Sequence, residues 1–345
     1  MTPSSIALLF VAMTVIWISF ALVLIMSERV KQSFYADDDE PDDFDPKNPR
    51  YRPPTQPLEV FHALDGKRLG YRQYRCANKD APLLIFIHGS TNYSGLYEPL
   101  AKMIVRSNAA HVILPDLRGH GLDFAQRGIA SYVGQLEDDI ASLIKTVRSP
   151  NQSVILGGHS LGGGFAIRFA AGKHRNMIER VFLIAPYLNT RAPTNRPYAG
   201  GFIRVLYRRI IGLAMLGVPK LFGLSELPVV QFNFSKIYHQ FARSWLSTDR
   251  YNFAMTMSFG PRQRWRQDIR NLPPFLLVIG DQDQAFYADQ YEPVMSQLTD
   301  QGRYVVLPDV NHVDASLDQR TVQAFQDFLQ RTNQPNVAKP KGQLV

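Results

Sequence analysis

Cysteine is almost absent from this sequence, which contains only Cys76 among its 345 residues. An intramolecular disulfide is therefore impossible, so a small disulfide-held scaffold is excluded and a reducing compartment is favoured. No close pair of His or Cys residues has the spacing of a metal site, and we expect no metal ion. The composition, with 45% hydrophobic and 20% charged residues, is that of an ordinary globular protein.

Charge is absent from the twenty-one residues Ile6–Met26. At about 1.5 Å of rise per residue, a helix of this length can span the hydrocarbon core of a bilayer. The preceding tail, residues 1–5, has no Lys or Arg, and no small-x-small cleavage site follows the run, so an uncleaved transmembrane anchor is favoured over a signal peptide. Arg29 and Lys31 follow the run, and the positive-inside rule then places the rest of the chain on the cytoplasmic side.

Aliphatic residues are scarce between residues 27 and 56, where acidic residues and prolines are abundant. The stretch Ala36–Gln56 has the composition of a solvated spacer. Its carboxylates lack the spacing and the glycine of an EF-hand loop, so we do not expect a calcium site. We predict a linker over residues 27–56, a folded domain over residues 57–332 and a flexible C-terminal tail over residues 333–345.

From residue 57 onward, short apolar runs alternate with helix-length segments. Two runs on either side of Asp65 and Gly66 have the pattern of a β-hairpin. Six further runs are continuously apolar, as is typical of parallel strands buried on both faces: Pro82–Gly89, Ala110–Gly119, Ser153–Ser160, Ile178–Pro186, Pro274–Asp281 and Arg303–Val310. Helices are predicted at Gln135–Arg148, Leu161–Lys173 and Gln319–Arg331. This alternation predicts an α/β fold with a doubly wound, mostly parallel sheet.

The alternation is interrupted over residues 189–272, which we predict to be an inserted, mainly helical cap over the carboxyl edge of the sheet. This segment contains thirteen Lys and Arg residues and three acidic residues, a local charge of +10 in a chain whose net charge is +8. Within it, the segment Gly201–Gly217 groups Arg204, Arg208 and Arg209 on one side of a predicted helix. A basic surface fits a membrane or a nucleic acid. Because no nucleic-acid-binding module is present and the chain has an apolar anchor, we expect a membrane and no nucleic acid.

Glycine is concentrated in the stretch "VILGGHSLGGGFAIRFAAG", residues Val154–Gly172. A P-loop requires G-x-x-x-x-G-K-[ST] and a dinucleotide site requires G-x-G-x-x-G. Neither pattern occurs here, and we expect no cofactor. The pattern G-x-S-x-G does occur, as Gly158, His159, Ser160, Leu161 and Gly162. Because it joins a predicted strand to a predicted helix, it indicates a nucleophile elbow, in which the glycines leave room for a strained serine.

A neutral serine is a poor nucleophile, so Ser160 needs a base that takes its proton and a third group that orients the base. In this type of fold the three residues follow the chain order Ser, acid, His. His312 is the one histidine that follows a late strand of the predicted sheet, while Asp281 and Asp283 follow the strand before it. The spacing alone leaves either carboxylate as the acid.

The oxyanion that forms during acyl transfer requires backbone donors that are already in place. The N–H of Leu161, directly after the nucleophile, is one candidate. The other is the N–H of Ser90, in the loop "FIHGST" (Phe86–Thr91) that follows the first central strand.

Together these segments resemble the α/β-hydrolase family over residues 58–331. The matching motifs are "HGSTNYSGLYEPLAKMI", "LPDLRGHGLD", "GGHSLGG", "GDQDQAF" and "NH", in the family's order. Within that family the chain is most similar to the monoacylglycerol lipase and lysophospholipase branch. The resemblance implies that Ser160 is the nucleophile, His312 the base and Asp283 the orienting acid, with Asp281 as the alternative. It also implies that Asp116 and Arg118 shape the floor of the site.

These features lead us to expect a membrane-anchored serine hydrolase that cleaves carboxylic esters of acyl lipids, such as monoacylglycerols or lysophospholipids. The alternatives on the same fold are a carboxylesterase of soluble esters, a thioesterase or an S33-type peptidase, because fold does not determine substrate. A non-catalytic, membrane-anchored scaffold is the alternative from another class. The sequence does not indicate an oligomeric state.

Overall fold

The six continuously apolar runs form the parallel part of one eight-stranded sheet. The computed structural model describes residues 2–30, 47–123, 126–197, 203–217, 221–232 and 246–332. The strands of the large sheet are β1 (Glu59–His62), β2 (Arg68–Tyr74), β3 (Leu83–Ile87), β4 (His111–Pro115), β5 (Val154–His159), β6 (Arg180–Ile184), β10 (Phe275–Gly280) and β11 (Gly302–Leu307). They lie in the order β1-β2-β4-β3-β5-β6-β10-β11. The hairpin β1–β2 is antiparallel, β2 pairs antiparallel with β4, and the other pairs are parallel, so the predicted mostly parallel sheet is confirmed.

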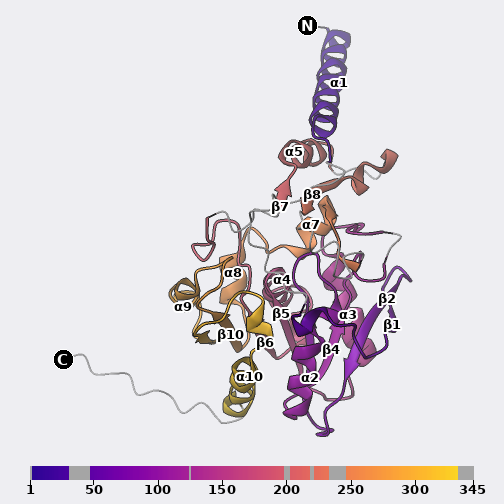
Figure 1. Cartoon of the computed structure of the whole chain (residues 1–345). Coiled ribbons are helices and arrows are strands. Elements are labelled where there is room, and N and C mark those ends of the chain that lie inside the picture. Colours follow the sequence, from indigo (N-terminus) through magenta and orange to yellow (C-terminus); the bar gives the residue numbers. More distant parts are fainter. Residues whose placement is uncertain are drawn as a thin grey trace, which may run out of the picture.

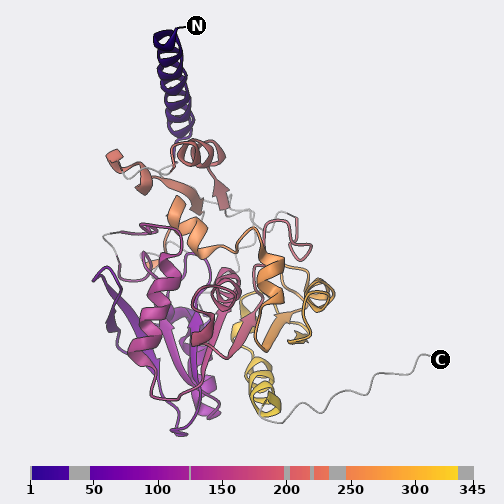
Figure 2. The same ribbon diagram turned by 180° about the vertical axis from the view of Figure 1, so that it is seen from behind.

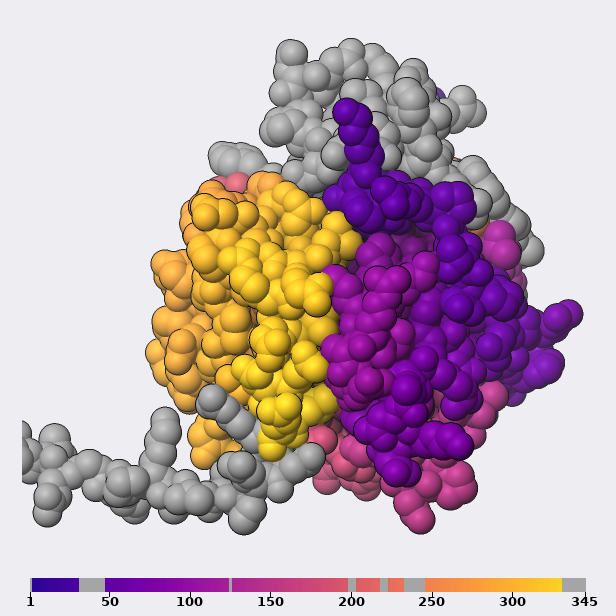
Figure 3. All heavy atoms as spheres, turned by 60° about the horizontal axis from the view of Figure 1, so that its bottom comes forward, coloured from indigo at the N-terminus to yellow at the C-terminus, as the bar shows by residue number. Residues whose placement is uncertain are grey.

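Helices cover both faces of this sheet because successive residues of a buried strand point to opposite sides. In β3, Leu84 and Phe86 pack with one group of buried residues, and Leu83 and Ile85 pack with another. The helices α2 (Glu98–Arg106) and α10 (Gln319–Thr332) lie on the first face, where the C-terminal segment packs against the N-terminal part of the domain (Figure 3). The helices α3 (Gln135–Val147), α4 (Leu161–Ala170) and α9 (Tyr291–Ser296) lie on the second face.

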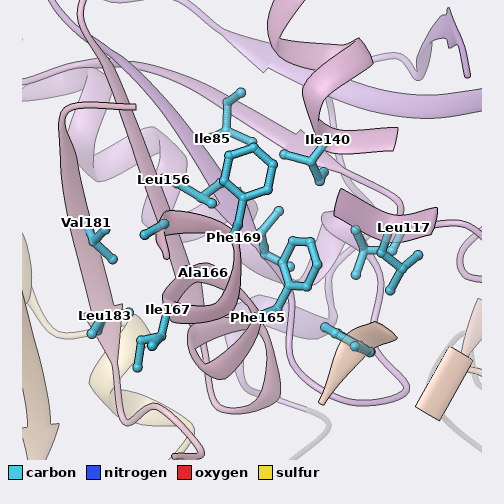
Figure 4. Packing of buried hydrophobic residues seen from close by; sticks show 14 of the residues in the cluster. Ile85, Leu117, Ile140, Leu156, Phe165, Ala166, Ile167, Phe169, Val181 and Leu183 are labelled. Atoms are coloured by element: carbon cyan, nitrogen blue, oxygen red, sulfur yellow. The ribbon is translucent and has the colours of Figure 1, made fainter. Parts of the chain in front are cut away.

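The helix α4 packs closely on the centre of the sheet and thereby fixes the start of the glycine-rich segment. Its Phe165 and Phe169 are fully buried against Ile85 and Leu156 of the strands below (Figure 4). Each such aromatic side chain removes a large apolar area from water, and burial of this kind contributes roughly 2–3 kcal/mol.

The inserted segment lies over the carboxyl edge of the sheet, and it contains strands that the sequence analysis did not predict (Figures 1 and 2). The strands β7 (Ile203–Val205), β8 (Pro228–Phe232) and β9 (Arg250–Asn252) form a three-stranded antiparallel sheet. They are accompanied by the helices α5 (Tyr207–Met215), α7 (Phe253–Phe259) and α8 (Trp265–Arg270) and by the short 3₁₀ helix η4 (Leu221–Glu226). Residues 198–202, 218–220 and 233–245 of the predicted cap lie outside the described residues.

The single helix predicted over residues 201–217 is therefore wrong in its first half. Arg204 lies on β7, whereas Arg208 and Arg209 lie on α5. The reason is local: Arg204 stands between the β-branched residues Ile203 and Val205, which favour a strand, and all three pair with β8.

The apolar N-terminal run forms α1 (Pro3–Ser27), which projects away from the rest of the molecule (Figure 1). By length and composition α1 is a candidate membrane span, and most of its surface is exposed. Thr2 caps its N-terminus by accepting a hydrogen bond from the N–H of Ser5, and Pro3 occupies the first turn, where its missing N–H costs nothing.

The prediction of a solvated spacer through residue 56 is wrong for its last part. Residues Pro49–Tyr51 form a 3₁₀ helix (η1) against the folded domain, and the buried Arg50 lies over the ring of Tyr97. Thr55 donates to the Glu98 carboxylate from both its N–H and its hydroxyl. Composition alone did not indicate these specific polar contacts. Residues 31–46 of the predicted linker and the predicted tail, residues 333–345, lie outside the described residues.

Candidate active site

Ser160 occupies the sharp turn between β5, which ends at His159, and α4, which begins at Leu161. Its backbone has φ 54° and ψ −120°, a strained conformation for a residue with a side chain. A Cβ atom on Gly158 would lie 2.3 Å from the carbonyl oxygen of Gly162, and one on Gly162 would lie 2.3 Å from the carbonyl oxygen of His88. The G-x-S-x-G spacing therefore has a steric cause: the turn closes only if both flanking positions lack a side chain.

His312 and Asp283 meet beyond the carboxyl ends of β11 and β10. The Nδ1 of His312 lies 2.7 Å from Oδ2 of Asp283, which is almost completely buried. The other carboxylate oxygen accepts hydrogen bonds from the backbone N–H groups of Ala285 and Phe286, both at 2.8 Å. Asp281 instead accepts the N–H of Asp309 and has no contact with the histidine. Of the two carboxylates that the sequence left open, the structure brings Asp283 to His312.

The ring of His312 lies beside the serine turn. Its centroid is 4.5 Å from that of His159, the residue that precedes Ser160, and Phe286 packs edge-on to it at 5.4 Å. In the part of the chain that the structure describes, the Ser160 hydroxyl makes no hydrogen bond, including with His312. Such contacts are commonly long in the absence of substrate and tighten when it binds.

The two predicted oxyanion donors have free N–H groups. Within the described residues, neither Ser90 N–H nor Leu161 N–H has a hydrogen-bond acceptor. The neighbours of Ser90 are both held by tyrosine hydroxyls: Gly89 N–H donates to Tyr97 at 3.0 Å, and Thr91 N–H donates to Tyr251 at 2.7 Å. The loop is thus fixed on each side of Ser90 while its own N–H stays available for a ligand.

A hydrogen-bonded bridge links this loop to His312, and the sequence analysis did not predict it. His159 appeared there only as the variable residue of the serine motif. In the structure its Nε2–H donates to the carbonyl oxygen of His312 at 3.0 Å, so its Nδ1 is the acceptor for the Tyr97 hydroxyl at 2.9 Å. The same hydroxyl accepts the N–H of Gly89. Burial lowers the pKa of His159 well below its usual range, which keeps the ring neutral and suited to this pattern.

Two further histidines beneath the cap are also buried and neutral. The Nε2 of His88 accepts the N–H of Leu117, so this nitrogen carries no proton, and burial lowers the pKa of His88 to about 4. His120 lies 4.8 Å away, centroid to centroid, and its Nε2 lies 2.8 Å from the hydroxyl of Tyr251. Burial lowers the pKa of His120 well below its usual range. Their hydrogen bonds connect the loops below the cap.

Asp116 and Arg118, which the resemblance places at the floor of the site, are engaged in buried contacts. Asp116 accepts the N–H of Ser94 at 2.7 Å and thereby supports the segment after the Ser90 loop. Arg118 forms ion pairs with Asp65 and Asp139, both at 2.8 Å. These partners satisfy the hydrogen-bonding groups and charges of both side chains.

The strand order, the serine turn after β5 and the acid and histidine after the last two strands define the α/β-hydrolase fold. The chain belongs to the family described as serine aminopeptidase, S33, whose model matches residues 78–313.

Among curated proteins, the chain is 30% identical over 120 residues to phospholipase YtpA of Bacillus subtilis. The aligned residues are 35% of this chain and 46% of that protein. It is 27% identical over 177 residues to the monoglyceride lipase of Homo sapiens, and the aligned residues are 51% of this chain and 56% of that protein. The matches thus span about half the length of these relatives.

Among solved structures, a soluble variant of monoglyceride lipase from Saccharomyces cerevisiae in complex with a substrate analogue superimposes with a TM-score of 0.59. It is 16% identical and covers 85% of this chain and 98% of that chain. At this identity the likeness concerns the fold.

Proposed function

We propose that this protein is a serine hydrolase that cleaves carboxylic esters through an acyl-enzyme formed on Ser160. The observation that carries the proposal is the placement of a strained serine beside a histidine that is hydrogen-bonded to a buried carboxylate. The Ser160 hydroxyl attacks the ester carbonyl while Nε2 of His312 takes its proton. Asp283 holds the ring in the required orientation, and the oxyanion is bound by Ser90 N–H and Leu161 N–H.

The first half of the reaction ends when His312 gives its proton to the leaving alcohol and the acyl group stays on Ser160. In the second half, His312 takes a proton from a water molecule that attacks the acyl-enzyme, and it gives that proton to the Ser160 oxygen as the carboxylic acid leaves. The residues require no metal or cofactor for this sequence.

A fluorophosphonate probe tests the nucleophile directly, because it reacts with activated serines. We expect the wild-type protein to be labelled and Ser160→Ala to lose the label, with Ser149→Ala as the matched control, since Ser149 is exposed and far from the turn. A folded wild-type protein that takes no label, or a label that persists in Ser160→Ala, would contradict the proposal and favour a non-catalytic scaffold.

We further propose that the substrate is an acyl lipid and that α1 anchors the protein in the bilayer that supplies it. Support comes from the uncharged run of α1, from the local charge of +10 over residues 189–272, which include the helix α5 that packs on α1, and from the similarity to a phospholipase and to monoglyceride lipases. Each Lys or Arg close to an anionic bilayer contributes about 1 kcal/mol to association.

The substrate class can be tested by comparing long-chain monoacylglycerol and lysophospholipid in vesicles with short p-nitrophenyl esters, a thioester and an N-terminal peptide amide. We expect the highest kcat/KM for one of the two lipids. Activity confined to the short esters would favour a soluble-ester carboxylesterase, and cleavage of the peptide amide alone would favour the peptidase activity in the family's name.

The orientation of α1 is a separate part of the proposal. Arg29 follows the apolar run and no basic residue precedes it, so we place the folded domain on the cytoplasmic side. A C-terminal reporter that is active only outside the cytoplasm should therefore be silent, and an active reporter would reverse the orientation.

A further inference from the structure

The C-terminal end of α1 packs against the helix α5 of the cap. Ala21 and Ile25, one turn apart on α1, are fully buried, whereas most of α1 is exposed. A Cβ atom on Gly212 of α5 would lie 2.5 Å from the carbonyl oxygen of Ala21. The two helices therefore approach each other as closely as a glycine permits, a contact typical of membrane helix pairs.

Arg209 completes this junction by capping the C-terminus of α1. Its buried guanidinium donates to the carbonyl oxygens of Ile25 and Glu28, which have no partner within the helix, and to that of Pro228 on β8. The Glu28 carboxylate in turn accepts the N–H of Arg209 at 3.0 Å. One side chain thus connects the anchor, α5 and the small sheet of the cap.

The position of this junction along α1 sets the depth of α5. The uncharged run of α1 ends at Met26. Contacts with α5 extend along α1 from Trp17 to Glu28, and the Nε1 of Trp17 donates to the carbonyl oxygen of Met215. If residues 6–26 fill the hydrocarbon core, Ala21 lies about 8 Å inside the boundary at 1.5 Å per residue. The helix α5 then begins near the boundary, where Arg209 contacts Glu28, and its Gly212 lies about 8 Å on the acyl-chain side, a depth typical of interfacial helices. Its place at the base of α1 agrees with this level (Figures 1 and 2).

The outward face of α5 is suited to that level. Tyr207 and Ile211, one turn apart, are 67% and 53% exposed, and Ala214 continues the same face. Arg208 is exposed beside them. Apolar residues with a tyrosine and an arginine are the composition of a helix that lies in the interface, because the tyrosine stays at the headgroup level and the arginine reaches outward to water or phosphate.

We propose that α5 is a second membrane contact, with Tyr207, Ile211 and Ala214 immersed at the headgroup boundary of the leaflet from which α1 emerges. This inference rests on the anchor in the proposed function. It means that the bilayer holds the cap, through Arg209 and Gly212, and that the hydrolase domain is suspended from the cap. Tyr251 of β9 then carries the connection from the cap to the loop of Ser90.

The proposal can be tested with single-cysteine variants, because Cys76 is the chain's one cysteine and is buried. In a Cys76→Ser background of the full chain, Ile16→Cys, Ile211→Cys and Val306→Cys are labelled with a bimane dye. The proteins are then placed in vesicles of phosphatidylcholine and phosphatidylglycerol. Val306, on β11 of the hydrolase domain, is the matched control because its exposure of 50% is close to that of Ile211.

We expect a doxyl lipid to quench the dyes at positions 16 and 211, and aqueous iodide to quench the dye at position 306. Lipid quenching at position 16 with iodide quenching at position 211 would overturn the role of α5 and leave the anchor intact. Iodide quenching at position 16 would overturn the anchor itself, and lipid quenching at all three positions would show adsorption without a specific contact.

A further variant, read with the same dyes at positions 16 and 211, tests the junction itself. Arg209→Gln removes the cap of α1, and we expect it to reduce lipid quenching at position 211 while quenching at position 16 stays unchanged. Unaltered quenching at both positions, in a variant whose circular dichroism matches that of the parent, would contradict the role of Arg209 in holding α5 at the bilayer.

Discussion

Asp281 and Asp283 are two carboxylates at the end of the same strand with different surroundings. Asp283 is enclosed, accepts two backbone N–H groups and faces His312, while Asp281 accepts the N–H of Asp309 near the surface. A residue that acts only through the histidine is a positioning residue, and its removal leaves the histidine in the wrong tautomer or orientation.

We predict that Asp283→Asn lowers kcat by up to about 10⁴-fold with little effect on KM, because an amide cannot stabilise the histidine that carries the serine's proton. Asp281→Asn is the matched change two residues earlier and should leave kcat within a few-fold of wild type. Steady-state kinetics on one ester checks both. The assignment of Asp283 would be wrong if the two variants lost activity in the opposite order.

The hydroxyl of Tyr97 has three partners: it accepts the N–H of Gly89 and, at 3.4 Å, the amide of Asn92, and it donates to Nδ1 of His159. We predict that Tyr97→Phe destabilises the protein by about 1–3 kcal/mol, because a buried donor and a buried acceptor lose their partner. Since the Gly89 loop carries Ser90, we also expect a fall in kcat that exceeds any rise in KM. Denaturant unfolding and steady-state kinetics provide the two measurements, and a variant with normal kcat would limit the bridge to stability.

Among the secondary-structure elements, the junction of β5 and α4 depends most strictly on sequence. We predict that Gly162→Ala prevents the serine turn from forming and lowers stability by more than about 3 kcal/mol, because the new Cβ would overlap the carbonyl oxygens of Ile87 and His88. Gly66→Ala is the control: unlike Gly162, Gly66 has a positive φ, of 77°, but no atom lies near its Cβ position, so backbone strain alone should cost about 1 kcal/mol. Thermal unfolding compares the two, and equal costs would contradict the steric argument.

The elements of the large sheet were predictable because each has a local cause. Strands such as β5 and β10 are buried on both faces and read as unbroken apolar runs between turn residues. The cap sheet was not predictable in this way. Its strand β7 has three residues and pairs with β8, more than twenty residues later along the chain, so tertiary contacts rather than a local pattern decide its conformation.

In the candidate site, too, some residues were predictable from local motifs and others depend on tertiary structure. Ser160 and His312 follow from motifs at strand ends, since the carboxyl ends of parallel strands meet at one edge of the sheet. The spacing does not decide between Asp283 and Asp281; the resemblance to the family favoured Asp283, and it is the path of the loop that brings this carboxylate to His312. The contact of Tyr97 with His159 joins residues 62 positions apart that no motif connects.

At the scale of the whole molecule, burial lowers the pKa of three histidines among the described residues, His88, His120 and His159, and keeps them neutral. In the unfolded chain their pKa is about 6.5. Below that value the unfolded chain binds more protons than the folded one, so the free energy of unfolding must decrease as the pH falls from about 6.5 toward about 4. Buried carboxylates such as Glu98, whose pKa is lowered by Lys102 and Thr55, begin to lose their contribution only below their ordinary pKa of about 4.3.

We predict a loss of about 2 kcal/mol for each of these histidines between about pH 7 and about pH 5. Denaturant unfolding in detergent at several pH values measures the slope. His62→Gln is the matched control, because His62 is exposed on β1 and its removal should leave the slope unchanged. Constant stability across this range would mean that the three histidines are not buried as neutral groups.

The contact between α1 and α5 also has a consequence for biosynthesis. Ile25 and Arg209 are 184 positions apart, so a ribosome that adds about 5–20 residues per second needs roughly 10–40 s to complete the second after the first. During that interval Ala21 and Ile25 have no α5 to cover them, and the last carbonyl groups of α1 have water as their partner. Correct assembly therefore ends with a late docking of α5 on α1, and any helix or chaperone that occupies this face of α1 first would delay the folding of the cap.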